Sequence, residues 1–117
     1  MLALNSVLLS GRATSEPKMT WETANGHVRG QFTLAVNREG PHGGTDFIPI
    51  VAWDDRAREM AEHVRKGTRV NVAGDLRIHP FDGRDGVRRT FPYVQSTELL
   101  FPTLEAHKAL ANAAPAL

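Results

Sequence analysis

Hydrophobic and polar residues alternate along the middle of the first half of the chain. From residue 28 to residue 38, one side of an extended chain would carry Val28, Gly30, Phe32, Leu34 and Val36. The other side would carry Arg29, Gln31, Thr33 and Asn37. Successive side chains of a strand point to opposite faces, so this pattern predicts a half-buried antiparallel strand.

Residues 45–53 are also extended in pattern, but they are apolar on both sides. Ile48, Ile50 and Ala52 fall on one side, and the other side carries Phe47, Pro49, Val51 and Trp53. We expect the first side to enter a core. The second side carries two large aromatic rings and therefore needs another partner, either more protein or the flat faces of unstacked nucleic-acid bases.

A short amphipathic helix is predicted directly after Trp53. Its apolar positions follow the i, i+3, i+4, i+7 spacing of one helix face, at Ala57, Met60, Ala61 and Val64. Asp54 or Asp55 is expected to cap its first turn. Gly67, which follows Arg65 and Lys66, is expected to end it.

The remaining strands complete a recognisable order. Strands are predicted over residues 6–12 and 68–77 and within 87–101, where Pro92 implies an edge position or a bulge. Asn25-Gly26 predicts a turn that closes a hairpin arm carrying Met19 and Trp21. The order is typical of an all-β fold with one helix, the five-stranded Greek-key OB-fold barrel with its helix between strands 3 and 4. We assign residues 1–102 to this domain and residues 103–117 to an Ala-rich tail or the start of a linker.

Composition fits one globular domain with an uneven charge. The 117 residues include no cysteine, and the formal net charge is +1. Residues 39–62 hold two basic against six acidic residues, whereas residues 65–89 hold seven basic against three acidic residues. The second stretch could hold an anionic backbone, or its charges could be ordinary solvated surface. No stretch approaches the roughly 20 apolar residues of a membrane span, and we expect a cytoplasmic protein.

The chain offers little material for catalysis. Its five histidines are scattered, with no pair at the spacing of a metal site, and there is no phosphate-binding GxxxxGK[ST] loop or GxSxG motif. We therefore expect no enzyme activity, no cofactor and no metal. The aromatic rings favour a binding function instead, because four of them fall on the proposed outer face or its flanking loops: Trp21, Phe47, Trp53 and Phe81. Each ring taken alone could equally be a packing residue.

Four segments together resemble one family. NSVLLSGR (residues 5–12), QFTLAVNR (31–38), TDFIPIVAW with the helix that ends in RKG (45–67) and VNVAGDLR (70–77) occur in the order found in the bacterial and mitochondrial single-stranded DNA-binding proteins. The resemblance implies a homo-oligomer of OB-folds, typically a tetramer, although a dimer is also open. It implies a nucleoid-associated protein that coats single-stranded DNA without strict sequence preference in DNA replication, repair and recombination, with replication or repair proteins as possible partners.

The resemblance also implies roles for particular residues. Phe47, Trp53, Phe81 and Trp21 correspond to base-stacking aromatic positions, with Phe81 expected in the loop between strands 4 and 5. Lys66 and Arg77 match basic positions near the phosphates. Together with the basic stretch, the residues expected to meet phosphates are Lys66, Arg77, Arg84, Arg88 and Arg89.

Some features depart from the family pattern. Ile48 stands where a histidine is often used at subunit contacts, the loop at residues 40–44 carries no aromatic ring, and the chain ends in Pro-Ala-Leu rather than in an acidic tip. Either a tail has been removed, or the chain is a tailless paralogue that resembles the primosomal replication proteins. The alternative function is therefore an OB-fold interaction module that uses its exposed aromatic residues mainly for protein contacts.

Overall fold

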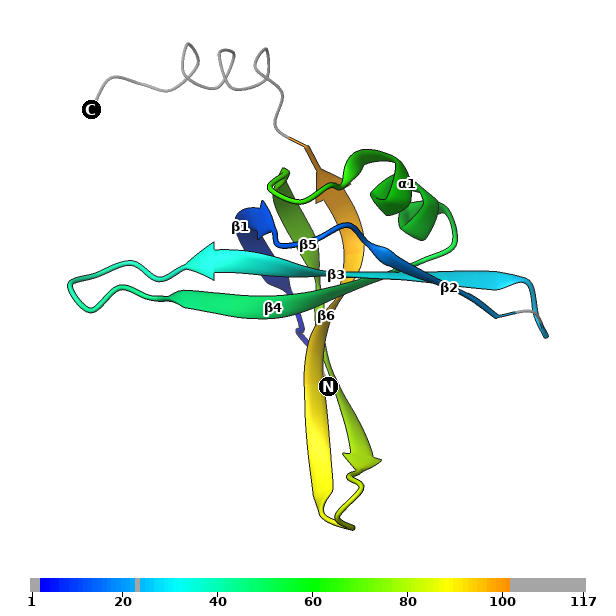
Figure 1. The fold of residues 1–117 in the computed structure, drawn as a ribbon. Coiled ribbons are helices and arrows are strands. Elements are labelled where there is room, and N and C mark those ends of the chain that lie inside the picture. Colours follow the sequence, from blue (N-terminus) through cyan, green and yellow to red (C-terminus); the bar gives the residue numbers. More distant parts are fainter. Residues whose placement is uncertain (1–2, 23, 102–117) are drawn as a thin grey trace.

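The computed structural model describes residues 3–22 and 24–101, so the predicted tail at 103–117 lies outside the described residues. The elements are β1 (Val7–Ala13), β2 (Lys18–Glu22), β3 (His27–Asn37), β4 (Thr45–Trp53), α1 (Asp55–His63), β5 (Arg69–Asp82) and β6 (Arg88–Leu100) (Figure 1). The strand order is β1-β5-β6-β4-β3-β2, and β1 also pairs with β3. Five strands thus form a closed ring, with β2 extending it alongside β3. The predicted OB-fold order is confirmed, including the helix between the third and fourth strands of the ring.

The core lies inside this ring. On β3, Val28, Gly30, Phe32 and Leu34 are buried and alternate with partly exposed residues, as the pattern predicts. The buried hydrophobic cluster combines β3 with every other strand of the ring and with the helix; it contains Ala13, Val28, Phe32, Leu34, Ile50, Ala52, Ala57, Met60, Val64, Val70, Val72, Val94 and Leu99.

Closure of the ring depends on a change of partner along β1. Residues 7–12 of β1 pair with β5, and Arg12 and Ala13 pair with β3. At the crossing point, a Cβ atom on Gly11 would collide with the backbone carbonyl oxygen of Ala35. Glycine is required there because the obstructing atom is main chain and cannot rotate away.

The helix α1 covers one end of the ring. Ala57, Met60 and Val64 are fully buried, and the absent side chain of Gly30 leaves the space that the Met60 sulfur and Ala57 occupy. The predicted end at Gly67 is wrong, because the helix ends at His63 and Val64 has extended φ and ψ angles of −91° and 128°. This early exit lets the chain turn towards β5 while the Val64 side chain stays in the core. Gly67 lies in the following turn, with φ of 88°.

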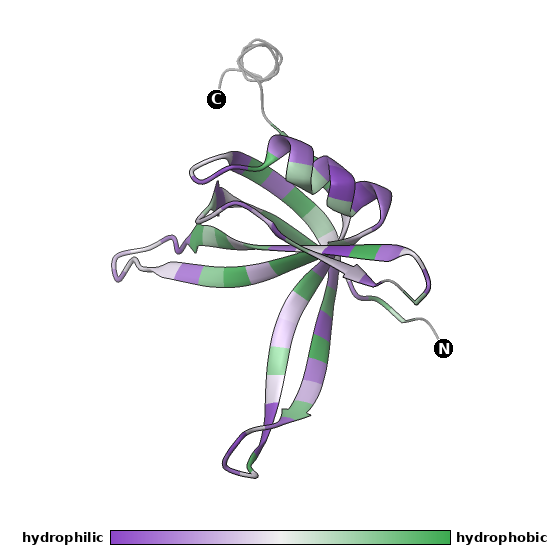
Figure 2. Ribbon diagram, turned by 45° about the vertical axis from the view of Figure 1, so that its right-hand side comes forward, coloured by the Kyte–Doolittle hydropathy of each residue, from purple (hydrophilic) through white to green (hydrophobic). Residues whose placement is uncertain are grey.

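Strands β5 and β6 continue past the ring as a two-stranded arm, residues 76–82 and 88–93, which projects from the ring (Figure 1). The sequence predicted that β5 would end at Arg77, but the pairing runs on to Asp82, which lies opposite Arg88. Apolar and polar residues alternate along the arm (Figure 2). Pro92 lies opposite Ile78, while β4 pairs with β6 only at Val94 and Gln95, so the predicted edge position of Pro92 is confirmed.

Polar contacts hold both ends of the β3–β4 pairing. Near the loop end, Arg38 Nη2 donates to Asp46 Oδ1 at 2.7 Å. At the helix end, the Asp54 carboxylate accepts from the Val28 backbone N–H at 3.2 Å and lies 3.0 Å from His27 Nδ1. The Val28 hydrogen bond is the main reason that the pKa of Asp54 is lowered.

Asp54 therefore does not act as predicted. Its side chain makes no capping hydrogen bond to the helix, because the carboxylate is already directed towards β3. Its backbone has φ of 53° and ψ of −118°, a conformation that costs a residue with a side chain roughly 1–3 kcal/mol. The contacts with His27 and Val28 offset this strain.

This strain makes the order of two substitutions predictable. Asp54→Ala and Asp54→Gly both remove the carboxylate, but only glycine also removes the backbone strain. We expect Asp54→Gly to be more stable than Asp54→Ala by about 1 kcal/mol in urea unfolding. At the neighbouring helical residue the order should reverse, with Asp55→Ala more stable than Asp55→Gly by about 0.5–1 kcal/mol. A more stable alanine at both positions would contradict the strain at Asp54.

Candidate nucleic-acid interface

One face of β3 and β4 points away from the core. Residues directly opposite each other on paired strands point to the same face, so Arg29 shares a face with Trp53, Gln31 with Val51, and Ala35 with Phe47. Phe47 is 65% exposed, and Trp53 is partly exposed. The face that was predicted to carry aromatic rings therefore does so at both ends of β4.

The same face continues onto the arm. Val51 lies opposite Gln95 of β6 as well as Gln31 of β3. From Gln95 the alternation places three further pairs on this side: Tyr93 with Arg77, Phe91 with His79, and Arg89 with Phe81. We call this continuous surface the outer face; with the β2 residues that lie opposite β3 on the same side, it comprises Lys18, Thr20, Glu22, His27, Arg29, Gln31, Thr33, Ala35, Phe47, Pro49, Val51, Trp53, Asp75, Arg77, His79, Phe81, Arg89, Phe91, Tyr93 and Gln95.

Two of the expected details are corrected. Phe81 lies within β5, not in a loop, because the arm is longer than predicted; its side chain is 41% exposed. Val51 was expected to contribute to the exposed apolar surface, but it is only 1% exposed. Its neighbours on the outer face, Gln31 and Gln95, flank it on both sides. The exposed aromatic surface is therefore divided into a Phe47 end and a Trp53 end.

Phe91 and Tyr93 join the outer face although the sequence did not single them out. Their rings stack with centroids 6.0 Å apart and an interplanar angle of 25°. Residues 89, 91, 93 and 95 do alternate with Val94 and Ser96, which are buried. The sequence predicts a strand within residues 87–101 but not its aromatic side, because Pro92 interrupts the alternation.

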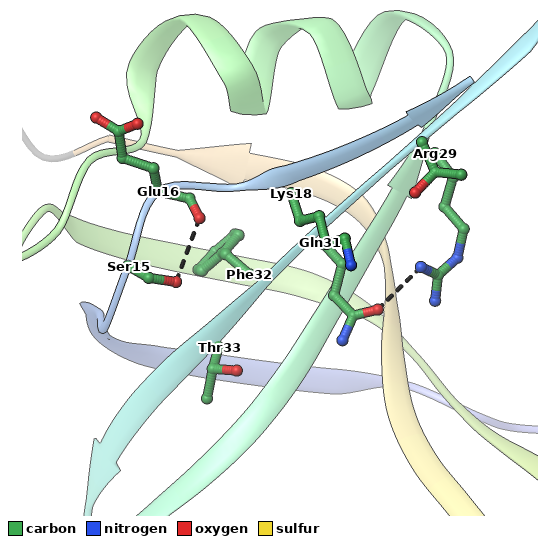
Figure 3. Close-up of a pocket in the computed structure, with 8 residues that line it drawn as sticks. Ser15, Glu16, Lys18, Arg29, Gln31, Phe32 and Thr33 are labelled. Carbon is green, nitrogen blue, oxygen red and sulfur yellow. Dashed lines mark hydrogen bonds between the residues drawn. The ribbon is translucent and has the colours of Figure 1, made fainter.

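Two hollows that share Arg29 adjoin each other along the β2–β3 hairpin. The aromatic hollow has a volume of about 290 Å³ and is lined by Glu22, Arg29, Trp53, His79, Phe91 and Tyr93. The polar hollow, of about 330 Å³, lies between the β1–β2 connection and β3, and Lys18, Thr20, Arg29, Gln31 and Thr33 are among its lining residues. Arg29 lines both hollows, and its Nη1 donates to Gln31 Oε1 at 2.9 Å (Figure 3). The sequence also did not identify the polar residues of β2 and β3 as part of a site, because charged and hydrogen-bonding residues on the exposed side of a half-buried strand resemble ordinary surface residues.

Trp21 is separated from this surface. It lies opposite Val28, whose side chain is buried in the core, so Trp21 belongs to the helix-facing side of the β2–β3 hairpin. It is nevertheless 63% exposed, since β2 extends beyond the ring. Of the four aromatic residues predicted as a set, Phe47, Trp53 and Phe81 share the outer face and Trp21 does not.

The predicted basic residues differ in their availability. Arg77 is paired with Asp75, which raises the pKa of Arg77, and Arg89 Nη2 lies 2.7 Å from Asp85 Oδ2, which lowers the pKa of Asp85. Arg88 also has an acidic partner, since its Nη1 lies 3.8 Å from Asp82 Oδ1.

Arg84 and Lys66 form no ion pair within the part of the chain that the structure describes. Arg84 lies in the turn of the arm, on the same projection as the aromatic residues of β5 and β6. Lys66 lies in the turn before β5, at the other end of that strand. Arg84 is therefore the predicted basic residue that combines a place on the arm with freedom from an ion pair.

Over residues 3–22 and 24–101, no group of three His, Asp or Glu side chains is arranged to hold a metal ion. Within those ranges there is also no helix with the length and apolar character needed to cross a membrane. A third hollow, of about 280 Å³, is apolar and includes Val7, Leu9, Phe47, Ile48, Leu76 and Pro92 in its lining.

Comparison with known proteins agrees with this geometry. Single-stranded DNA-binding protein 3 of Clostridium acetobutylicum is 35% identical over 101 residues, which cover 84% of this chain and 70% of that protein. The single-stranded DNA-binding protein of Bacillus cereus is 35% identical over 106 residues, covering 87% of this chain and 59% of the relative. The single-stranded DNA-binding protein of Clostridium perfringens is 34% identical over 86 residues, which cover 74% of this chain and 57% of that protein. Residues 4–102 match the single-strand binding protein family, and the chain belongs to that family.

Proposed function

We propose that the outer face binds single-stranded DNA by stacking bases on aromatic rings, without strict sequence preference. The observation that carries this proposal is the shared orientation of Phe47, Trp53 and Phe81, together with the Phe91–Tyr93 pair, on one continuous sheet surface. Aromatic rings accept any base, and each stacked base contributes roughly 1–3 kcal/mol. Several rings on one face can therefore bind a strand tightly with little sequence readout.

Basic residues supply the second part of the interaction. We propose that phosphates are met by Arg84 and, once their aspartate partners are displaced, by Arg77 and Arg89. Arg88, which pairs with Asp82 on the other side of the arm, would take part only where the strand passes around the turn of the arm. Lys66 would take part only if the strand also passes the turn before β5. Trp21 would stack a base only if the strand bends around β2 to the helix-facing side. Binding of this kind suits protection of single strands during replication, repair and recombination, a non-enzymatic role in the cytoplasm at the nucleoid.

A second candidate is a protein-interaction module. The apolar hollow beside Phe47 favours it, because Val7, Leu9 and Leu76 would be covered by a protein partner and gain little from a phosphate backbone. In that case a protein partner would cover Phe47, and DNA would leave the fluorescence of Trp53 unchanged. Tryptophan fluorescence distinguishes the two functions.

The two tryptophans can be observed separately. In a Trp21→Phe variant, oligo-dT should quench the emission of Trp53, because stacking brings a base against the indole ring. In a Trp53→Phe variant, the remaining Trp21 should be quenched much less, because it lies on the other side of the β2–β3 hairpin. No quenching of Trp53 and no mobility shift at low salt would reject DNA binding on the outer face. Strong quenching of Trp21 alone would move the binding surface to the helix-facing side.

Salt dependence tests the phosphate contacts. Each phosphate contact to single-stranded DNA contributes about 0.7 to the slope of log K against log salt. We expect Arg84→Ala to reduce the magnitude of that slope by about 0.7 and to weaken binding to all sequences alike. Lys66→Ala, the same loss of one charge at the far end of β5, should leave the slope unchanged. A slope unaffected by Arg84→Ala would contradict a strand path along the arm.

We also propose that the protein forms homo-oligomers, a dimer or a tetramer, through β1. Residues 7–11 of β1 pair only with β5 among the described residues, and Leu8 on that strand is 80% exposed. An unpaired strand edge with an exposed leucine favours pairing with another strand.

Substitution of Leu8 tests this assembly. For the unchanged protein, light scattering over a range of concentrations should give a mass that is a multiple of the chain mass. Leu8→Lys should shift the measured mass towards that of the monomer. Leu4→Lys, the same change at an exposed residue before β1, should leave the mass unchanged. A monomeric unchanged protein at high concentration would reject this interface.

A further inference from the structure

An acidic residue lines the aromatic hollow on a face proposed to hold a polyanion. The side chain of Glu22 makes no hydrogen bond or ion pair within residues 3–22 and 24–101, although Arg29 lines the same hollow. A carboxylate repels the phosphates of a bound strand. The groups that a strand can present to Glu22 favourably are the N–H donors on the edge of a base.

The walls of the hollow suit a base rather than a phosphate. Trp53, Phe91 and Tyr93 come from two different strands and provide ring surfaces, and the volume of about 290 Å³ has room for one planar base. Arg29 uses Nη1 to hold Gln31 Oε1, which leaves its other N–H groups for a ligand. The hollow thus combines stacking surfaces with an acceptor from β2 and a donor from β3.

The four DNA bases differ in how well they match this combination. A carboxylate only accepts hydrogen bonds, and guanine is the base with two adjacent N–H donors on one edge, at N1 and N2. Guanine also has acceptors at O6 and N7, the pair that arginine recognises in DNA. Adenine, cytosine and thymine each offer a single donor group on that edge, so they can satisfy Glu22 with one hydrogen bond at a time.

We propose that this hollow receives one base of the bound strand and prefers guanine, with Glu22 accepting from N1–H and N2–H and Arg29 donating to O6 or N7. The inference rests on the proposed DNA-binding function and adds to it a single selective position. The rest of the outer face stays tolerant of sequence, because its exposed rings can stack any base. Glu22 and Arg29 are then the residues that determine the preference.

Base analogues test each contact separately. The probes are short oligo-dT strands with one central guanine, hypoxanthine (which lacks the N2 amino group), 7-deazaguanine (which lacks N7), adenine or cytosine. Trp53 quenching in the Trp21→Phe background measures each affinity. At about 1 kcal/mol, the lower end of what a paired base contact contributes, we expect the guanine strand to bind about fivefold tighter than plain oligo-dT. The hypoxanthine strand should lose most of that advantage, and the 7-deazaguanine strand part of it.

Variants connect the preference to Glu22. Glu22→Gln should abolish the guanine advantage and raise the affinity for plain oligo-dT, since a negative charge that repels the phosphates has been removed. Glu39→Gln removes the same charge from an exposed residue outside the hollow and should keep the guanine advantage. Glu22 is itself exposed, so neither variant is expected to impair folding.

The possible failures are distinguishable. Equal affinity for all the strands, with normal binding to oligo-dT, would overturn the guanine preference and leave the proposed function intact. A guanine advantage that persists in Glu22→Gln would equally overturn the role of Glu22. Loss of all binding to oligo-dT in the unchanged protein would overturn both the preference and the proposed function.

Discussion

The register between β3 and β4 is the constraint on which the rest of the structure depends. A shift of β4 by one residue relative to β3 would exchange the two faces of β4, moving Phe47 and Trp53 into the core and Ile50 out of it. The contacts at both ends of the pairing oppose such a shift: the Arg38–Asp46 ion pair near the loop, and Asp54 with the Val28 backbone and His27 at the helix. Asp54 makes the second contact from a backbone conformation with φ of 53°, so the strain and the contact occur at the same residue.

The core and the candidate interface are opposite faces of the same strands. Ile50 and Ala52 fill the ring while Phe47 and Trp53, their immediate neighbours in sequence, face outwards. The outer face can therefore be held rigidly without a separate scaffold. The arm extends the same division beyond the ring, since its aromatic side continues the outer face and its other side carries Leu76, Ile78 and Pro92.

Local patterns predicted what depends on local structure. The alternation in residues 28–38 identified the core positions of β3, and the order of elements identified the fold. The apolar spacing in the helix identified Ala57, Met60 and Val64 as core, but it also included Ala61, which is partly exposed. Features that depend on a distant partner were predicted less well. The length of β5 depends on pairing with β6, Val51 is buried because Gln31 and Gln95 flank it, and the face occupied by Trp21 depends on its partner Val28. The stacked Phe91–Tyr93 pair was missed because Pro92 interrupts the alternation that would have revealed it.

The ion pairs of the arm have a consequence for how quickly a strand could be released. A phosphate that approaches Arg89 or Arg77 must first displace Asp85 or Asp75, which occupy these guanidinium groups in the free protein. Each aspartate remains tethered beside its arginine and returns as soon as the phosphate moves away. On the proposed path of the strand, the aspartates would therefore compete with the phosphates, which would limit the lifetime of each phosphate contact and let a bound strand exchange one contact at a time.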